Sequence, residues 1–243
     1  MPITITTNEP KARKRVICIH GPAGVGKTTF ACGLGKALLI PTEVGYKDIA
    51  CDHLELQRTY LELMGTLMEL YGMTDLEYDT LVLDSVDWAE ILVDKQMDDE
   101  GVKRDYGKGV AEMGKRFKRI VDGCVALRDQ LDVNVVMIAH SQMKRVELPD
   151  GSEFDQWQPK LSKKSNEILI EAVDDIGYAH METVTKKVDG QFRERGVGKH
   201  TGRRMVSFVP SAAYVAKNRA RQGIEVPADM PLDPTEYSKL FLS

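Results

Sequence analysis

The chain has 243 residues, 42% of them hydrophobic and 29% charged, which is the composition of a globular protein able to bury a core. Its 33 basic and 37 acidic side chains give a formal net charge of −4, which excludes a surface that is basic all over. No apolar run approaches the roughly 18 residues of a membrane span, and the four cysteines lack the paired spacing of a zinc site or a disulfide framework. We therefore expect a cytosolic protein with no membrane partner and one α/β domain.

The first two thirds of the chain alternate between apolar runs and helical periodicity. Strands are predicted at 15–20, 38–40, 80–84 and 133–139, and helices at 28–38, 54–70, 86–97 and 110–131. Ser85 is the predicted N-cap of the third helix. Strands that alternate with helices indicate a mostly parallel sheet with helices on both faces.

The pattern changes after Asp174. Two strand-like runs, 176–188 and 205–209, have no helix between them and are joined by a loop rich in Gly, Arg and Lys, which predicts an antiparallel extension at the sheet edge. The tail from 224 to 243 carries three prolines and is expected to pack as a loop with a short final helix. The predicted division is a flexible segment 1–14, an α/β core 15–223 and a tail 224–243 packed on that core.

The first predicted strand leads into a glycine-rich turn. The sequence GPAGVGKT at 21–28 fits G-x-x-x-x-G-K-[ST] and lies between a predicted strand and a predicted helix, the context that such a match requires. Glycines let successive N–H groups point at phosphate oxygens, Lys27 places an ammonium on the β- and γ-phosphates, and Thr28 offers a hydroxyl to Mg²⁺. The competing interpretation is a glycine turn followed by Lys-Thr by chance. The predicted ATP-binding residues are Gly21, Pro22, Ala23, Gly24, Val25, Gly26, Lys27, Thr28 and Thr29.

A triphosphate site also needs acidic groups. Asp84 ends the apolar run 80–84, at the strand end where open α/β sheets bind ligands, so we expect it to hold Mg²⁺ together with Thr28. An apolar run that ends in Asp is common by itself, and the preceding P-loop is what makes this one informative. The candidates for a group that orients the attacking water are Glu43, Asp52, Glu55 and Asp87. Glu43 directly follows the predicted strand 38–40, so we expect it at the same edge of the sheet as the P-loop. The alternative interpretation of Glu43 is a solvated carboxylate in a loop.

Two further features are candidates for sensing the nucleotide and binding a polyanion. His140 and Gln142 follow the strand 133–139, where a polar group can sense the γ-phosphate, although a structural, hydrogen-bonded histidine is the alternative. Lys and Arg outnumber acids in 101–119 and in 186–204, and the expected loop 141–165 places aromatic residues among lysines, as single-stranded nucleic acid requires. The alternative is a solvated surface on which Trp157 covers the core. The predicted DNA-binding residues are Lys103, Arg104, Lys144, Arg145, Trp157, Lys160, Lys163 and Lys164.

Five short segments occur in an order that resembles a known family. They are GPAGVGKT at 21–28, PTE at 41–43, TLVLDS at 80–85, IAH at 138–140 and AKNR at 216–219. Over 16–223 this succession resembles the phage RecA-like ATPases of the Sak group, which are single-strand annealing or recombination proteins reduced to a RecA core. The resemblance implies an α/β fold with a RecA-like P-loop NTPase core, in which a mostly parallel, twisted sheet is flanked by helices.

The resemblance also implies roles for single residues. Glu43 matches the glutamate that activates water, with Pro41 in place of the family's aspartate two residues earlier. His140 and Gln142 lie in the segment that senses phosphate, and 101–109 and 144–165 match the two DNA-binding loops. Lys217 and Arg219 match the basic pair that reaches the ATP of the adjacent subunit, as an arginine finger does; without the family match, both are ordinary surface charges. The implied catalytic residues are therefore Lys27, Glu43, Lys217 and Arg219.

The resulting prediction is an ATP-dependent, single-stranded-DNA-binding recombination protein that promotes annealing or strand pairing. It is expected to be phage-encoded, to act in the bacterial host cytosol as a ring or filament of identical subunits, to use ATP and Mg²⁺, and to meet a single-strand-binding protein. One alternative is a P-loop kinase of a nucleotide or small metabolite, in which the basic segment 186–204 forms a lid. The other is an ATP switch with little turnover, such as a loader of a replication protein.

Overall fold

The computed structural model describes residues 13–148, 150–188, 195–221 and 223–243. Its strands are β1 (Val16–Gly21), β2 (Ala37–Pro41), β3 (Asp52–His53), β4 (Thr80–Asp84), β5 (Asn134–Glu147), β6 (Glu153–Pro159), β7 (Asp175–Val188), β8 (Arg195–Ser207) and β9 (Met230–Pro231). Its α-helices are α1 (Lys27–Cys32), α2 (Tyr60–Tyr71), α3 (Val86–Asp99), α4 (Lys108–Leu131), α5 (Lys163–Ala172) and α6 (Pro234–Tyr237). Residues 1–12 of the predicted N-terminal segment lie outside the described residues.

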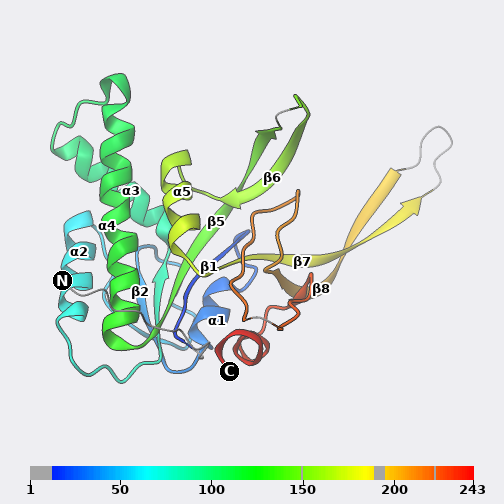
Figure 1. Ribbon diagram of the computed structural model, residues 1–243, viewed down its shortest axis with the longest axis horizontal. Helices are drawn as coiled ribbons and strands as arrows, with labels where there is room; N and C mark the ends of the chain where they lie inside the picture. Colours follow the sequence, from blue (N-terminus) through cyan, green and yellow to red (C-terminus); the bar gives the residue numbers. More distant parts are fainter. Residues whose placement is uncertain (1–12, 149, 189–194, 222) are drawn as a thin grey trace, which may run out of the picture.

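One sheet of nine strands organises the described part of the chain (Figure 1). The strand order is β3-β2-β4-β5-β1-β7-β8-β9, and β6 pairs with β5 outside that row. Neighbouring strands from β3 to β7 in this row pair in parallel, whereas β8 and β9 add antiparallel strands at one edge. This arrangement confirms the predicted fold class, a mostly parallel sheet flanked by helices with an antiparallel edge extension.

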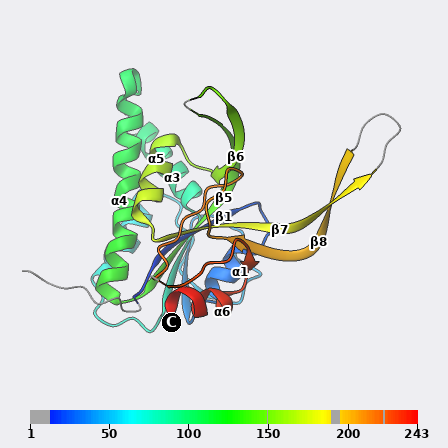
Figure 2. The ribbon, with the colours of Figure 1, turned by 45° about the vertical axis from the view of Figure 1, so that its right-hand side comes forward.

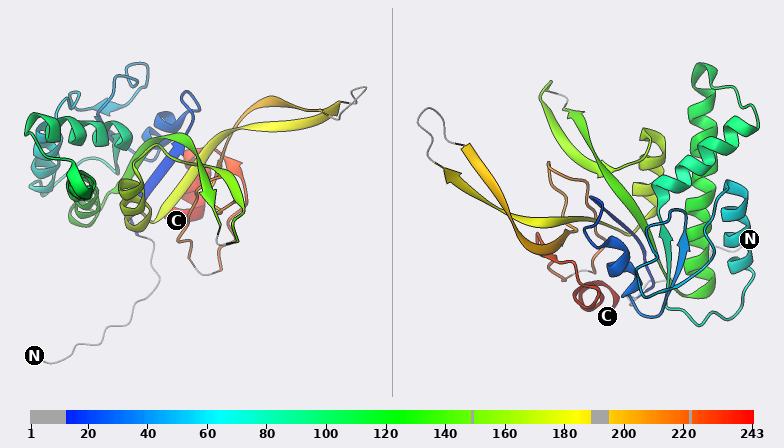
Figure 3. Two further views of the ribbon diagram at one scale, coloured as in Figure 1. Left: turned by 90° about the horizontal axis from the view of Figure 1, so that it is seen from above. Right: turned by 180° about the vertical axis from the view of Figure 1, so that it is seen from behind.

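Helices cover both faces of the sheet, so its central strands are buried on both sides. On one face Cys18, Leu83 and Met137 pack with the buried residues of α2, α3, α4 and α5. On the other face Val82 and Ile138 pack with residues of α1 and α6. Figure 3 shows these two helical layers from above and from behind. Burial on both faces explains why the central strands are continuous apolar runs instead of alternating patterns.

Two predicted helices are shorter than the periodicity indicates. The first ends at Cys32 instead of continuing to 38, because Gly33 and the left-handed Gly35 (φ 74°) turn the chain into β2. The second begins at Tyr60, where Thr59 and Glu62 form a capping box. Residues 54–58 instead run beside the strand ends, with the backbone N–H of Leu54 donating to the carbonyl of Leu39 at 2.9 Å. Apolar spacing alone therefore misplaced the starts and ends of these helices.

The expected loop at 141–165 is wrong. β5 continues past Ala139 to Glu147 and forms an antiparallel hairpin with β6, in register from Ser141 opposite Pro159 to Glu147 opposite Glu153. α5 follows this hairpin directly. Backbone pairing between the two strands supplies the hydrogen bonds that a polar segment would otherwise make with water. The central strand β5 therefore runs without interruption from the core into the hairpin.

A second hairpin, formed by β7 and β8, projects from the sheet edge as an arm (Figure 2). The connection at 189–194 lies outside the described residues. At the root of the arm the tail returns to the sheet: β9 pairs with β8, and Tyr237 and Phe241 are buried. The Tyr237 hydroxyl donates to Asp175 at 2.8 Å, and Arg15 Nε donates to the Phe241 carbonyl at 3.0 Å. In the described ranges, every helix is too short or too polar to traverse a lipid bilayer.

Candidate nucleotide site

The P-loop lies at the carboxyl end of β1, between that strand and α1. Gly24 and Gly26 have positive φ values of 74° and 101°, a conformation that side chains other than glycine rarely adopt. A Cβ added at Gly21 would come within 2.3 Å of the Ala179 carbonyl oxygen on β7. The glycines are therefore required by the backbone path of the loop, and the left-handed turns produce the curled cradle of N–H groups that a phosphate chain fits.

Lys27 lies buried at the first position of α1. Its Nζ donates to the carbonyl oxygens of Gly21 at 3.0 Å and Pro22 at 2.9 Å, both of the same loop. It makes no ion pair with any carboxylate that the structure describes, and burial lowers its pKa although Asp84 opposes that shift. The ammonium is therefore held by neutral carbonyls, which a phosphate oxygen can replace.

Thr28 and Asp84 are in direct contact beside the P-loop. The Thr28 hydroxyl donates to Asp84 Oδ2 at 2.7 Å, and burial raises the pKa of Asp84. A hydroxyl and a carboxylate are hard oxygen ligands that suit Mg²⁺. The described residues hold no group of three or more His, Cys, Asp or Glu side chains that would bind a metal by itself. Thr28 and Asp84 are therefore the residues that would hold a magnesium ion beside the P-loop.

Three further ionisable groups lie near the P-loop. His140 is fixed by Asp87, which accepts the His140 backbone N–H at 3.0 Å and bonds ring Nδ1 at 2.9 Å. The hydrogen bond to Asp87 raises the pKa of His140, and the pKa of Asp87 is lowered by its bonds to His140 even though burial acts in the opposite direction. Glu43 is half-buried, and loss of hydration raises its pKa. This geometry leaves His140 Nε2 as the ring nitrogen that Asp87 does not engage.

Most of these groups, although not Asp87, line a cavity of about 330 Å³. It is lined by Ala23, Gly24, Gly26, Lys27, Thr28, Thr29, Glu43, Gly45, Ile49, Asp84, His140 and Arg204. The structure therefore brings most of the predicted P-loop together with Asp84, Glu43 and His140. Arg204, on β8, was not among the predicted site residues and was noted only within the basic segment 186–204.

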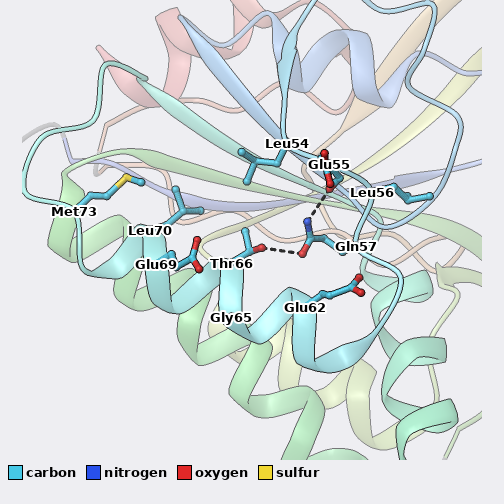
Figure 4. Close-up of a pocket in the computed structure, with 10 residues that line it drawn as sticks. All are labelled: Leu54, Glu55, Leu56, Gln57, Glu62, Gly65, Thr66, Glu69, Leu70 and Met73. Carbon is cyan, nitrogen blue, oxygen red and sulfur yellow. Dashed lines mark hydrogen bonds between the residues drawn. The ribbon is translucent and has the colours of Figure 1, made fainter.

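A larger cavity, of about 440 Å³, lies between the segment 54–57 and α2 (Figure 4). Glu55, one of the candidates for water activation, lines this cavity and not the P-loop cavity. Its lining contains Glu62 and Glu69 but no Lys or Arg, and Thr66 donates its hydroxyl to Gln57 at 2.8 Å. An acidic lining whose polar groups bond to each other does not suit a phosphate chain.

The remaining predicted site residues lie away from the P-loop cavity. Gln142 Nε2 donates to the carbonyls of Pro159 at 3.1 Å and Leu161 at 2.9 Å and does not line the cavity. Lys217 and Arg219 lie at the opposite end of the sheet, because Lys217 bridges Ile176 at the start of β7. A single protomer therefore does not bring its own Lys217 and Arg219 to its P-loop.

Lys217 and Arg219 both have partners within the protomer. Lys217 Nζ donates to the carbonyls of Ile170 at 2.6 Å and Val173 at 2.7 Å, at the carboxyl end of α5. Burial and the neighbouring Arg219 lower the pKa of Lys217. Arg219 pairs with the buried Asp174 at 3.1 Å. To act on the nucleotide of a neighbouring copy, Lys217 and Arg219 must break these contacts and form new ones with that nucleotide.

The predicted DNA-binding residues form two groups. Lys103 and Arg104 precede α4, and Arg104 pairs with Asp94 at 2.7 Å and Asp98 at 2.5 Å. The others lie on the β5–β6 hairpin, on α5 and between them; they are Lys144, Arg145, Trp157, Lys160, Lys163 and Lys164. In the second group, Arg145 pairs with Glu153 at 3.1 Å.

The sequence comparisons agree with this geometry. Residues 13–220 match the protein family described as AAA domain, a span of well over half of the chain. A search of curated proteins found no match. The matched span contains the P-loop, Asp84, Glu43 and His140, which are the groups that form the cavity. The chain therefore belongs to the AAA domain family, and its core is a nucleotide-binding P-loop ATPase domain.

Proposed function

We propose that this protein is an ATP-dependent, single-stranded-DNA-binding recombination protein that promotes annealing or strand pairing. The observation that carries the proposal is the course of β5. This strand places His140 in the P-loop cavity and continues directly into the β5–β6 hairpin, where Lys144 and Trp157 lie. A change in the position of His140 on nucleotide binding can therefore be transmitted through β5 to the DNA-binding candidates on the hairpin.

In this proposal the residues of the cavity bind and orient ATP. Lys27 and the loop N–H groups bind the phosphates, while Thr28 and Asp84 hold Mg²⁺, which neutralises phosphate charge when bound. Glu43, whose raised pKa makes its carboxylate a stronger base than a fully hydrated one, accepts the proton of an attacking water. Asp87 fixes the His140 ring so that Nε2 can sense the terminal phosphate.

The active form in this proposal is a ring or filament of identical subunits. Lys217 and Arg219 cannot reach the P-loop of their own protomer, so they act on the nucleotide of a neighbouring copy. Repetition of weak contacts also strengthens the grip on a single strand through effective concentration. The protein is proposed to be phage-encoded and to act in the host cytosol, alongside a single-strand-binding protein.

Phosphate release and oligonucleotide annealing, measured with and without single-stranded DNA, test this proposal. We expect DNA to increase phosphate release and ATP to increase annealing. Lys27→Ala should abolish tight ATP binding, because the phosphates lose their main cationic partner, whereas Lys239→Ala, at an exposed ion pair with Glu236, should leave it unchanged. Unchanged ATP affinity in Lys27→Ala would contradict the nucleotide site itself.

Two outcomes would favour the alternative functions. Transfer of phosphate to a nucleotide or metabolite acceptor, without stimulation by DNA, would indicate a kinase. Tight ATP binding with negligible phosphate release would indicate a nucleotide switch. Either result would contradict the recombination proposal while leaving the P-loop site intact.

A further inference from the structure

β8 brings an arginine to the P-loop at the root of the β7–β8 arm. Arg204 pairs with Met181 of β7, and its carbonyl accepts the backbone N–H of Leu232 at 3.0 Å. The backbone at this position is thus held from the arm on one side and from the tail on the other. Because the backbone of Arg204 is held on both sides, the fold of a single protomer is enough to place the side chain beside the P-loop.

The guanidinium lies directly against the last glycine of the P-loop. A Cβ added at Gly26 would meet Arg204 Nη1 at 3.0 Å and Cδ at 3.4 Å. Arg204 lines the same cavity as Lys27, Thr28 and Asp84. Two cationic side chains from different elements therefore converge on the loop, one from α1 and one from β8.

The charge of Arg204 has no partner among the residues that the structure describes. Within the part of the chain that the structure describes, its side chain forms neither an ion pair nor a hydrogen bond, and neither Glu43 nor Asp84 pairs with it although both line the same cavity. By contrast, Arg104, Arg145 and Arg219 all pair with carboxylates. An unpaired guanidinium beside a phosphate-binding loop has five donors available for an anion.

We propose that Arg204 binds the phosphate chain of the nucleotide from within the same protomer, on the side of the α- and β-phosphates. This inference rests on the nucleotide site described above. A P-loop backbone cradles the α- and β-phosphates, and Arg204 lies against that backbone at Gly26. A planar guanidinium can donate two parallel hydrogen bonds to phosphate oxygens, which an ammonium cannot do. The nucleotide thus receives an arginine in cis, independent of any neighbouring subunit.

Calorimetric titration of the full chain with Mg·ADP and with the non-hydrolysable analogue Mg·AMP-PNP tests the proposal without relying on turnover. We expect Arg204→Ala to weaken the binding of both nucleotides to a similar extent, by roughly tenfold to a hundredfold, the loss typical of a charge-assisted hydrogen bond. The affinities of Arg204→Lys should lie between those of the wild type and those of Arg204→Ala, because lysine keeps the positive charge but cannot donate two parallel hydrogen bonds. Arg203→Ala is the matched control: Arg203 is exposed and lines no described cavity, so its affinities should equal those of the wild type.

Several results would overturn the proposal. Arg204→Ala with unchanged affinity for both nucleotides would show that the side chain does not touch the phosphates. A loss confined to the ATP analogue would refute the assignment to the α- and β-phosphates. Thermal unfolding without nucleotide should give the same midpoint for all variants, and a lowered midpoint in Arg204→Ala alone would indicate a structural role instead. Failure of the wild type to bind either nucleotide would instead refute the nucleotide site as a whole.

Discussion

Replacing Lys217 by alanine tests what holds the end of α5. The Lys217 ammonium donates to the carbonyls of Ile170 at 2.6 Å and Val173 at 2.7 Å, so the variant leaves the last carbonyls of the helix without this partner. Each charge-assisted bond contributes about 1.5–3 kcal/mol. Because the side chain is only partly buried, we expect a combined loss of about 2 kcal/mol, which lowers Tm by about 4–8 °C in a chain of this size.

Urea unfolding followed by circular dichroism measures this loss. Lys239→Ala is the control, because it removes a lysine whose ion pair with Glu236 is exposed, and it should cost less than about 0.5 kcal/mol. If Lys217→Ala is no more destabilising than Lys239→Ala, the reasoning about the helix end is refuted. That result is expected if Lys217 binds only the nucleotide of a neighbouring copy and does not stabilise the end of α5.

A mixing experiment separates the structural role of Lys217 from its proposed action between subunits. Mixing Glu43→Gln protomers with protomers that carry both Lys217→Ala and Arg219→Ala should restore part of the phosphate release. In a randomly mixed equal assembly, about a quarter of the interfaces combine an intact Glu43 with an intact basic pair. Absence of rescue at every ratio would refute a shared site and leave Lys217 as a helix cap alone.

Three further predictions follow from the site. Asp87→Asn should lower the pKa of His140, because the hydrogen bond to Asp87 is the largest cause of its raised value, and an NMR titration of the ring measures this change. In the wild type the bond to the protonated ring stabilises the fold below pH 6.5, and this stabilisation is lost as the pH rises through the raised pKa of His140. Unfolding of both proteins at several pH values measures that loss. Trp157→Ala should weaken oligonucleotide binding by about 1–3 kcal/mol if a base stacks there, measured by anisotropy, and unchanged affinity would contradict the stacking role. Asp84→Asn should weaken ATP binding with Mg²⁺ but strengthen it in EDTA, measured by calorimetry, and equal losses in both conditions would contradict a metal-holding role.

The parts of the site that sequence predicted are those encoded locally. A P-loop specifies its own backbone through glycines, and Asp84 ends an apolar strand whose neighbours are fixed by the strand–helix alternation. The structure accordingly places the P-loop, Asp84 and Glu43 around one cavity. The catalytic roles of Lys27 and Glu43 stay predictions that belong to the proposed function.

The parts that sequence could not predict depend on pairing between distant segments. Arg204 meets Gly26 only because the register of β7 and β8 sets it opposite Met181, and the arm's register has an irregularity between Met181 and Thr183. Similarly, the β5–β6 hairpin was mistaken for a loop because its polar residues obtain their partners across the hairpin. Neither contact leaves a signal in the local residue pattern.

Several polar groups that line the P-loop cavity already bond to each other or to the loop, and a ligand must compete with these contacts. Lys27 bonds to two loop carbonyls, and Thr28 bonds to Asp84, so a nucleotide gains only the difference between these contacts and the new ones. A triphosphate can replace the carbonyls around Lys27. The negative charge of the triphosphate would then repel the Asp84 carboxylate, and this repulsion is strong where the dielectric constant is low. Thr28 and Asp84 are the residues that would hold a magnesium ion, and its charge would offset this repulsion. The arrangement therefore favours binding of nucleotide and metal together. Arg204, which has no carboxylate partner among the described residues, would under the proposal above offset part of the phosphate charge within the same protomer.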